Sequence, residues 1–129
     1  MFSFELMEDD GIIELTSVGQ TTVEDYQELA PKFFADVRSN NIKRVLLDAR
    51  QFQGWSSEDA RSIFFYSWME SLSLIDRIAV IAHPGIRDQV DYFSQFFRNA
   101  GKDFREFRPD QYKAAMEWLK SDQATHTGS

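Results

Sequence analysis

Apolar and polar residues follow patterns that predict alternating strands and helices along most of the chain. The clearest element is residues 76–82, where five apolar residues run without interruption between a charged pair and a His-Pro-Gly turn. A short apolar run bounded by turn residues is typical of a strand that is buried on both faces. We therefore expect the rest of the fold to cover both faces of this strand.

Two strands are predicted near the N-terminus. Residues 1–7 alternate apolar and polar side chains, and residues 12–18 resume an apolar pattern after an Asp-Asp-Gly turn. Because Asp-Gly turns join neighbouring strands of a hairpin, we expect these strands to pair antiparallel. Gly19-Gln20 is expected to end the second strand.

A helix and a further strand follow. Apolar residues at helical spacing begin after Thr22, whose side chain can cap the first turn. Pro31 falls inside this helix and is expected to kink it or to delay its regular start. The next strand is predicted at residues 44–50, and a helix between two strands favours parallel pairing. Residues 51–55 are predicted as a loop.

The second half of the chain continues the alternation. Helices are predicted at residues 57–74 and 86–100, with Gly101 ending the latter, and an edge strand at residues 103–107. A last helix begins after Pro109. The predicted fold class is therefore α/β, with a five-stranded mixed, mainly parallel sheet covered by four main helices.

Length and charge restrict the domain organisation and the partners. The 129 residues are expected to form one domain over residues 1–121, with a disordered polar tail over residues 122–129. A net charge of -7 disfavours nucleic acid as a partner and opposes strong membrane binding. With no cysteine, no signal-peptide pattern and no membrane-spanning apolar run, the expected location is the cytoplasm.

The helix predicted at residues 57–74 carries too much apolar surface for a simple amphipathic helix. Residues 63–66 read Ile-Phe-Phe-Tyr, and four consecutive residues cover the whole circumference of a helix. One sheet face cannot cover all the rings of this helix and the next. The candidate ligand-binding residues among them and the preceding loop are Phe52, Trp55, Phe64, Phe65, Trp68, Met69, Phe93 and Phe97.

Three arrangements can bury these rings. The two helices can pack together as an aromatic-rich core, which is the usual fate of such side chains. They can pair with a second copy of the chain across a two-fold axis, which gives a homodimer. They can also line a pocket for an apolar small molecule or lipid, with the helix at residues 57–74 as a lid or as a contact to a membrane surface.

Polar residues at the ends of two predicted strands suggest a binding rim. Asp48 and Arg50 end one strand and His83 follows the next, so neighbouring strands would bring them together with Trp55. Ligands of open parallel sheets bind at this edge, where Asp48 and His83 can orient a water or bind a polar head group. The alternative is that Asp48 caps a loop and His83 simply precedes a turn.

The sequence contains no catalytic or metal-binding signature around these residues. Ser56, His83 and Asp48 supply the members of a Ser-His-Asp triad, but no G-x-S-x-G sequence surrounds any serine. A hydrolase is therefore the least supported function. We expect no metal site and no cofactor, because cysteine is absent and the other histidine, His126, lies in the tail.

Four short segments, in their order and spacing, carry a family resemblance. They are T-x-E-D-Y at residues 22–26, R-V-L-L-D at 44–48, R-I-A-V-I at 77–81 and A-A-M-E-W-L at 114–119. Together they resemble the SpoIIAA-like proteins, which are related in fold to STAS domains and to CRAL-TRIO lipid carriers. The resemblance implies a SpoIIAA/STAS-like fold, a cytoplasmic setting and a non-enzymatic binding role, with apolar-ligand binding and peripheral membrane association as further expectations.

One motif of the STAS group is missing. Its anti-sigma-factor antagonists place a phosphorylatable serine in an Asp-Ser-Ser-Gly-like turn at a helix start. Here that region carries Ser56 and Ser57 without the motif, and helix capping explains both serines equally well. The first function hypothesis is therefore a non-catalytic binding module for an apolar or amphipathic small molecule. The alternative is a dimeric, STAS-type regulatory protein-interaction module, similar to an anti-sigma-factor antagonist.

Overall fold

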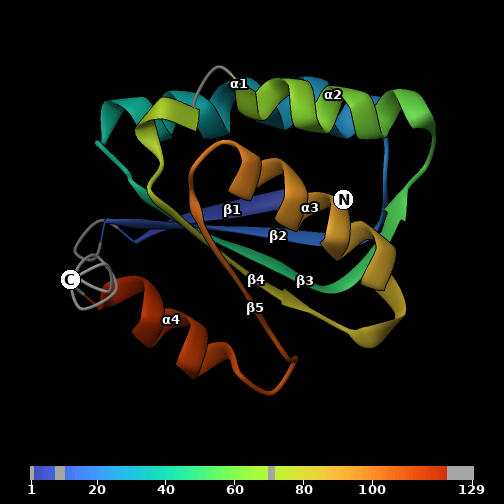
Figure 1. Cartoon of the computed structure of the whole chain (residues 1–129). Helices are drawn as coiled ribbons and strands as arrows, with labels where there is room; N and C mark the ends of the chain where they lie inside the picture. The colour runs from blue at the N-terminus through green and yellow to red at the C-terminus, as the bar shows by residue number, and fades with distance from the viewer. Residues whose placement is uncertain (1, 8–10, 70–71, 122–129) are drawn as a thin grey trace.

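A five-stranded sheet with helices on both faces forms the framework of the protein (Figure 1). The computed structural model describes residues 2–7, 11–69 and 72–121. The strands are β1 (Phe2–Met7), β2 (Ile12–Thr21), β3 (Arg44–Trp55), β4 (Arg77–Ala82) and β5 (Asp103–Phe107). The helices are α1 (Val23–Ser39), α2 (Glu58–Met69), α3 (Arg87–Asn99) and α4 (Tyr112–Lys120), with the short 3-10 helices η2 (Leu72–Leu74) and η3 (Pro84–Ile86). The predicted fold class is confirmed.

The strands lie in the sheet in chain order, β1-β2-β3-β4-β5. β1 pairs antiparallel with β2, and the three other pairs are parallel. Connections between parallel strands are right-handed, and each new strand here adds on the same side of the last one. The three connecting helices, α1, α2 and α3, therefore all lie on one face of the sheet, while α4 lies on the other (Figure 1).

Each face of the sheet has its own core. Val45 and Val80 point toward α1, α2 and α3, where they join the larger cluster, rich in aromatic rings. Leu46 and Ile81 point the other way and pack with the apolar face of α4. All four side chains are fully buried, which confirms the prediction that β4 is buried on both faces.

Two arginines fix the C-terminal end of α4. Arg44 and Arg77 stand opposite each other at the starts of β3 and β4. Arg44 donates to the carbonyl of Leu119, and Arg77 donates to those of Trp118, at 3.1 Å, and Ser121. Cations at a helix C-terminus satisfy its free carbonyl groups and oppose the negative end of its dipole. This explains how Arg77 is tolerated with only 1% of its surface exposed.

β2 and β3 extend further than the sequence predicts. β2 continues through Gly19 to Thr21, and residues 51–55, predicted as a loop, form the end of β3. The pairing shifts register twice along this stretch, first after Thr16 and again between Gly19 and Thr21. Gly19 and Gly54 both have positive φ, which bulges accommodate without ending a strand. The predicted strand ends are wrong because glycine was interpreted as ending a strand.

Local capping signals were predicted correctly. Thr22 and Asp25 form a capping box at the start of α1, with each side chain accepting from the other residue's backbone N–H at 3.1 and 2.9 Å. α1 starts without delay and remains helical through Pro31, so the predicted late start is wrong. Gly101, with φ +81°, follows α3 as predicted.

Two predicted helix boundaries differ from the structure. The helix predicted at residues 57–74 ends at Met69, and its last part forms the separate 3-10 helix η2. The helix predicted from residue 86 begins at Arg87, after η3. The predicted tail at residues 122–129 lies outside the described residues.

Candidate functional site

An open hollow lies at the carboxyl ends of β2 and β3, between the first turns of α2 and α3. Its volume is about 560 Å³. In parallel sheets this edge is where ligands bind, because the helix N-termini and the connecting loops meet there. The hollow is lined by Gln20, Gln53, Gly54, Trp55, Ser57, Glu58, Arg61, Asp88, Gln89 and Tyr92.

The extension of β3 places Trp55 in this hollow. The indole ring is partly buried, with centroids 5.3 Å from Phe52, 5.7 Å from Phe64 and 5.7 Å from Phe93. The hollow is therefore anchored on the aromatic core of the protein. Gly54 lies next to it, where an added Cβ would come within 3.4 Å of the Gln89 side chain on α3.

Ser57 holds the first turn of α2 at the rim of the hollow. Its Oγ accepts a hydrogen bond from the backbone N–H of Ala60 at 3.1 Å, which is the geometry of a helix N-cap. Ser56 is exposed, and its backbone N–H donates to the Thr21 carbonyl at 2.8 Å. Of the two serines predicted to cap α2, the structure thus selects Ser57.

Arg61 and Tyr92 form the side of the hollow. The guanidinium carbon of Arg61 lies 4.9 Å from the ring centroid of Tyr92, within the range of a cation–π interaction. Tyr92 is half exposed, at 50%. The carboxylates of Glu58 and Asp88 are also exposed at the rim. The surface therefore combines aromatic rings, amides and charges of both signs, a mixture typical of protein interfaces.

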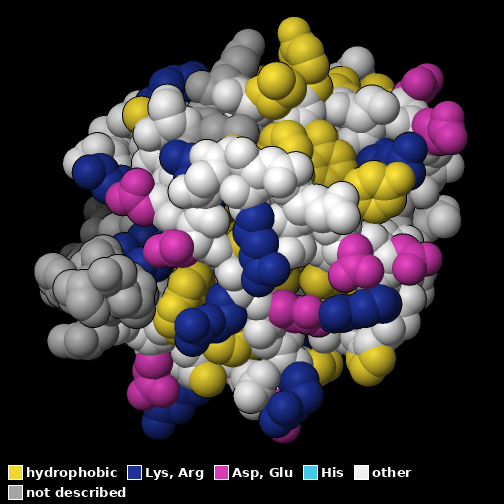
Figure 2. Space-filling model, viewed as in Figure 1, with side chains coloured by type: hydrophobic (Ala, Val, Ile, Leu, Met, Phe, Trp, Pro, Cys, Tyr) yellow, Lys and Arg dark blue, Asp and Glu magenta, His cyan; other side chains and the backbone are white. Residues whose placement is uncertain are grey.

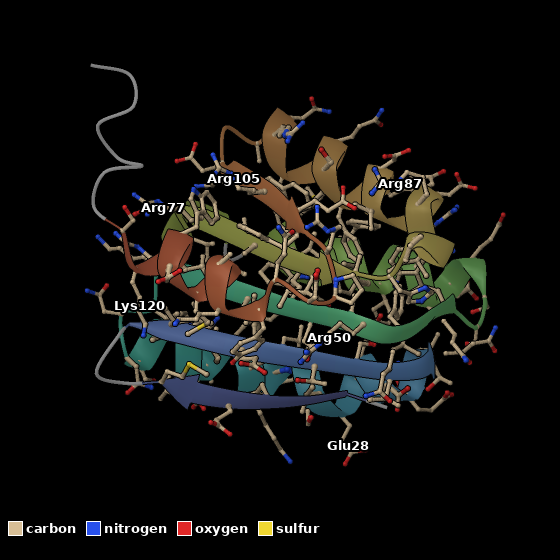
Figure 3. The ribbon with its side chains drawn as sticks, turned by 90° about the horizontal axis from the view of Figure 1, so that it is seen from below. Glu28, Arg50, Arg77, Arg87, Arg105 and Lys120 are labelled. Carbon is tan, nitrogen blue, oxygen red and sulfur yellow. The ribbon has the colours of Figure 1, made fainter. Side chains whose placement is uncertain are left out.

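The predicted rim of Asp48, Arg50, Trp55 and His83 is not assembled. Asp48 stands opposite Ile81 on the α4 face of the sheet, whereas Trp55 packs on the other face. Figure 3 views the sheet from the α4 side and shows Arg50 on that face. β3 and β4 are neighbours as expected, but the pleat of β3 places Asp48 and Trp55, seven residues apart, on opposite sides of the sheet.

Asp48 and Arg50 instead belong to a polar network beside α4. Arg50 donates to the Asp48 carboxylate from Nε at 2.9 Å and from Nη2 at 2.8 Å, and this bond raises the pKa of Arg50. Its guanidinium lies 5.4 Å from the ring centroid of Tyr112. The hydroxyl of Tyr112 donates to Glu14, and burial, followed by this bond, raises the pKa of Tyr112 to about 12. The groups of this network satisfy one another.

His83 also makes local bonds. Its Nδ1 accepts from the Gly85 N–H at 3.1 Å, and its Nε2 lies 2.9 Å from the Phe52 carbonyl, to which the neutral ring can donate. Both ring nitrogens therefore contact the backbone. The triad considered for Ser56, His83 and Asp48 is not assembled, since Asp48 bonds Arg50 on the far face. Among the described residues, no group of three potential metal-ligating side chains comes together.

The predicted ligand-binding aromatic residues largely form a core. Phe52, Phe64, Trp68, Phe93 and Phe97 are buried, and Phe65 is partly buried. Two small spaces that these rings help to line measure about 20 Å³ each, far less than a lipid requires. Met69, by contrast, is 61% exposed and points away from the core. The packed-core arrangement is therefore the one that the folded chain adopts for most of these rings.

Sequence reasoning missed several residues of the hollow. Gln20, Gln53 and Gln89 carry no distinctive motif, and they meet only because β2 and β3 extend past their predicted ends. Arg61 could have been found from its spacing, because it lies four residues after Ser57 and so shares its side of α2. Tyr92 belongs to the surplus of aromatic rings on the two helices, but it was not among the candidate ligand-binding residues.

Most of the chain matches the model of a known protein family. The model of a family described as SpoIIAA-like matches residues 12–120. The chain belongs to the SpoIIAA-like family. The match covers every element from β2 to α4, and it includes the whole hollow.

Solved structures support the fold of this SpoIIAA-like protein. An uncharacterized protein with a SpoIIAA-like fold from Shewanella loihica PV-4 aligns with a TM-score of 0.73 at 21% identity, covering 92% of each chain. The anti-sigma factor antagonist SpoIIAA in its unphosphorylated form aligns with a TM-score of 0.61 at 9% identity, covering 88% of this chain and 96% of that one. No match was found among curated proteins. None of the helices in the described residues has the length and apolar character needed to cross a membrane.

Proposed function

We propose that this SpoIIAA-like protein is a non-catalytic regulatory module that acts by binding another protein. Its fold is shared with the anti-sigma factor antagonist SpoIIAA. The observation that carries the proposal is the hollow beside the N-terminus of α2, which partly buried Arg61, exposed Tyr92 and the anchored ring of Trp55 line together.

The chemistry of the hollow suits a protein partner. Tyrosine, tryptophan and arginine dominate the energetics of protein interfaces, and all three are present here. The stacking of Arg61 on Tyr92 holds both long side chains in place before binding, which reduces the entropy lost on association. The glutamine amides around them can donate and accept hydrogen bonds at the rim.

Binding of an apolar ligand has less support. The aromatic rings proposed for that role contact one another, and the small spaces that they help to line hold about 20 Å³ each. A lid formed by α2 would have to break the contacts of Phe64 and Trp68 with α1 and α3. Peripheral membrane association would likewise face the net charge of -7.

Phosphorylation is the regulatory input that we attach to this proposal. Ser57 caps α2 and faces the hollow, so a phosphate there would meet the positive end of the helix dipole and Arg61 one turn later. Ser56, the preceding residue, is also exposed but makes no cap bond. A kinase-dependent mass shift that disappears in Ser57→Ala but not in Ser56→Ala would support Ser57, and the reverse result would assign Ser56.

The proposed interaction can be tested by photo-crosslinking in the cells that make the protein. A photoreactive phenylalanine analogue at position 92 should capture one protein repeatedly, and Arg61→Glu in the same chain should reduce that product. The matched control carries the analogue at the exposed position of Lys113, on α4, and should not give the product. Equal capture at both positions, or capture that is unaffected by Arg61→Glu, would contradict the assignment of the hollow.

A further inference from the structure

A second surface of the protein lies on the outer side of the helix layer, away from the hollow. A groove of about 510 Å³ runs between α1 and α2. Gln27, Pro31 and Arg38 line it from α1, and Ile63 and Tyr66 line it from α2. The surface around this groove is what we call the α1–α2 face.

The α1–α2 face exposes apolar side chains that its own fold does not use. The inner side of α2 consists of Ala60, Phe64 and Trp68, which are buried against the sheet and the neighbouring helices. Tyr66 and Met69 lie on the opposite side of the helix and are 68% and 61% exposed. Figure 2 shows hydrophobic side chains gathered over the top of this helix layer. Exposed apolar side chains clustered in this way mark interaction surfaces.

Charges are arranged with opposite signs at the two ends of the face. Glu24, Pro31 and Arg38 are seven residues apart along α1, so they share one stripe of the helix. Glu24 and Arg38 are both exposed, and neither has an ion-pair partner within the described part of the chain. The stripe therefore begins with a carboxylate, ends with a guanidinium, and has Pro31 at its midpoint.

We infer that the α1–α2 face binds a second copy of this chain across a two-fold axis near Pro31. A two-fold interface must be complementary to itself, because the same patch serves both partners. Rotation about an axis at Pro31 places Glu24 of each copy beside Arg38 of the other. Tyr66 lies level with Pro31, since Phe34 contacts Trp68 and Tyr26 contacts Phe64 across the two helices. The Tyr66 rings of both copies thus meet beside the axis.

The pattern favours a second copy over an anionic membrane. A membrane surface would be met by the acidic end of the stripe and by the net charge of -7, both of which oppose adsorption. In a dimer the acidic end meets a cationic end, so the local charges attract even though the whole copies repel. The hollow at the carboxyl ends of β2 and β3 remains outside the contact, so one dimer carries two such sites.

Sedimentation equilibrium of the full chain over a range of concentrations tests this inference. The chain mass is 15.1 kDa, and we expect a reversible rise to twice that mass. Tyr66→Glu should weaken the dimer on the order of a hundredfold, because each substitution acts twice and places charges at the axis. Tyr92→Glu, at another exposed tyrosine, should leave the dimer unchanged. Thermal unfolding of both variants checks that they fold.

A charge reversal makes the test specific for the proposed axis. Glu24→Arg alone and Arg38→Glu alone should each weaken the dimer about three- to tenfold, because two rim ion pairs are replaced by repulsion. The double variant restores opposite charges across the axis and should recover most of the affinity. A monomeric wild-type chain at all concentrations would overturn the inference. So would a dimer that survives Tyr66→Glu, or a double variant weaker than either single one.

Discussion

Two buried hydroxyl side chains on β2 differ in whether they have a hydrogen-bond partner. Thr21 is fully buried, and its Oγ1 lies 2.7 Å from the hydroxyl of Tyr26, so the two groups satisfy each other. Ser17 is 8% exposed, and its Oγ has no hydrogen-bond partner among the described residues. An unpaired buried hydroxyl costs folding energy, whereas a paired one contributes to it.

Ser17→Ala is therefore expected to leave the free energy of unfolding unchanged or to raise it by up to ~1 kcal/mol, since it removes an unsatisfied group. Thr21→Ala should lower it by ~1–3 kcal/mol, because a buried hydrogen bond to the hydroxyl of Tyr26 is lost. Urea unfolding of the two variants against the wild type measures both effects. A clear loss of stability in Ser17→Ala would show that this hydroxyl has a role that the packing does not reveal.

Substitution of the two serines before α2 should change the free energy of unfolding by different amounts. Ser57→Ala removes the N-cap bond to Ala60 and is expected to cost ~1 kcal/mol of stability. Ser56→Ala removes only an exposed side chain and should change stability by less than ~0.5 kcal/mol. If the larger loss followed Ser56→Ala, the assignment of the cap would be wrong.

Tyr112 gives the protein a pH dependence in the alkaline range. The ordinary pKa of tyrosine is about 10, and burial together with the bond to Glu14 raises that of Tyr112 to about 12 in the folded chain. Between these values the folded state binds more protons than the unfolded state, so stability falls as pH rises. The contribution of Tyr112 is complete below pH 10 and is lost as pH passes about 12.

In Tyr112→Phe the free energy of unfolding should accordingly fall less steeply between pH 10 and pH 12 than in the wild type. At neutral pH, the difference in free energy of unfolding between the two proteins measures the loss of the hydrogen bond alone. Chemical unfolding at a series of pH values measures the two slopes. Equal slopes in the variant and the wild type would mean that Tyr112 titrates alike in both states.

At the scale of elements, the sequence predicts where strands and helices lie but not where β2 and β3 end. The apolar runs and capping residues are local signals, and they located the nine main strands and helices of the described residues. The register shifts in β3 are set by pairing with β2, which no local pattern records. One extra residue in a strand reverses the side to which the following side chains point. For Asp48 and Trp55 the two register shifts cancel, and because these residues are seven apart the pleat alone places them on opposite faces.

Gly54 is the residue through which this extension can be tested. Its φ of +97° is unfavourable for any residue with a Cβ, and an added Cβ would also approach the Gln89 side chain at 3.4 Å. Gly54→Ala should therefore cost more than ~1 kcal/mol of stability. Gly19→Ala is the control, since its φ is +69° and no atom lies within 4 Å of the added Cβ. An equal or smaller cost at Gly54 would contradict the described end of β3.

At the scale of the whole molecule, the sequence shows a surplus of aromatic rings on α2 and α3, but only the packing shows where each ring lies. The sequence left three arrangements open: a core, a second copy or a ligand pocket. Most rings join one core, with contacts such as Trp68 to Phe97 at 5.2 Å. Tyr66, Met69 and Tyr92 remain outside it. A sequence cannot distinguish these two groups, because both lie in the same two helices and share the same chemistry.

Native mass spectrometry of the full chain, isolated gently from the cells that make it, tests most directly whether the chain binds a protein rather than a lipid. We expect peaks for the chain, alone or paired, and for its complex with another protein, and Arg61→Glu should diminish the peak of that complex. We expect no adduct of lipid mass, since the rings fill the interior. A lipid-sized adduct on the wild-type chain, lost on disruption of the α2 core by Phe64→Ala but kept in Arg61→Glu, would contradict this expectation.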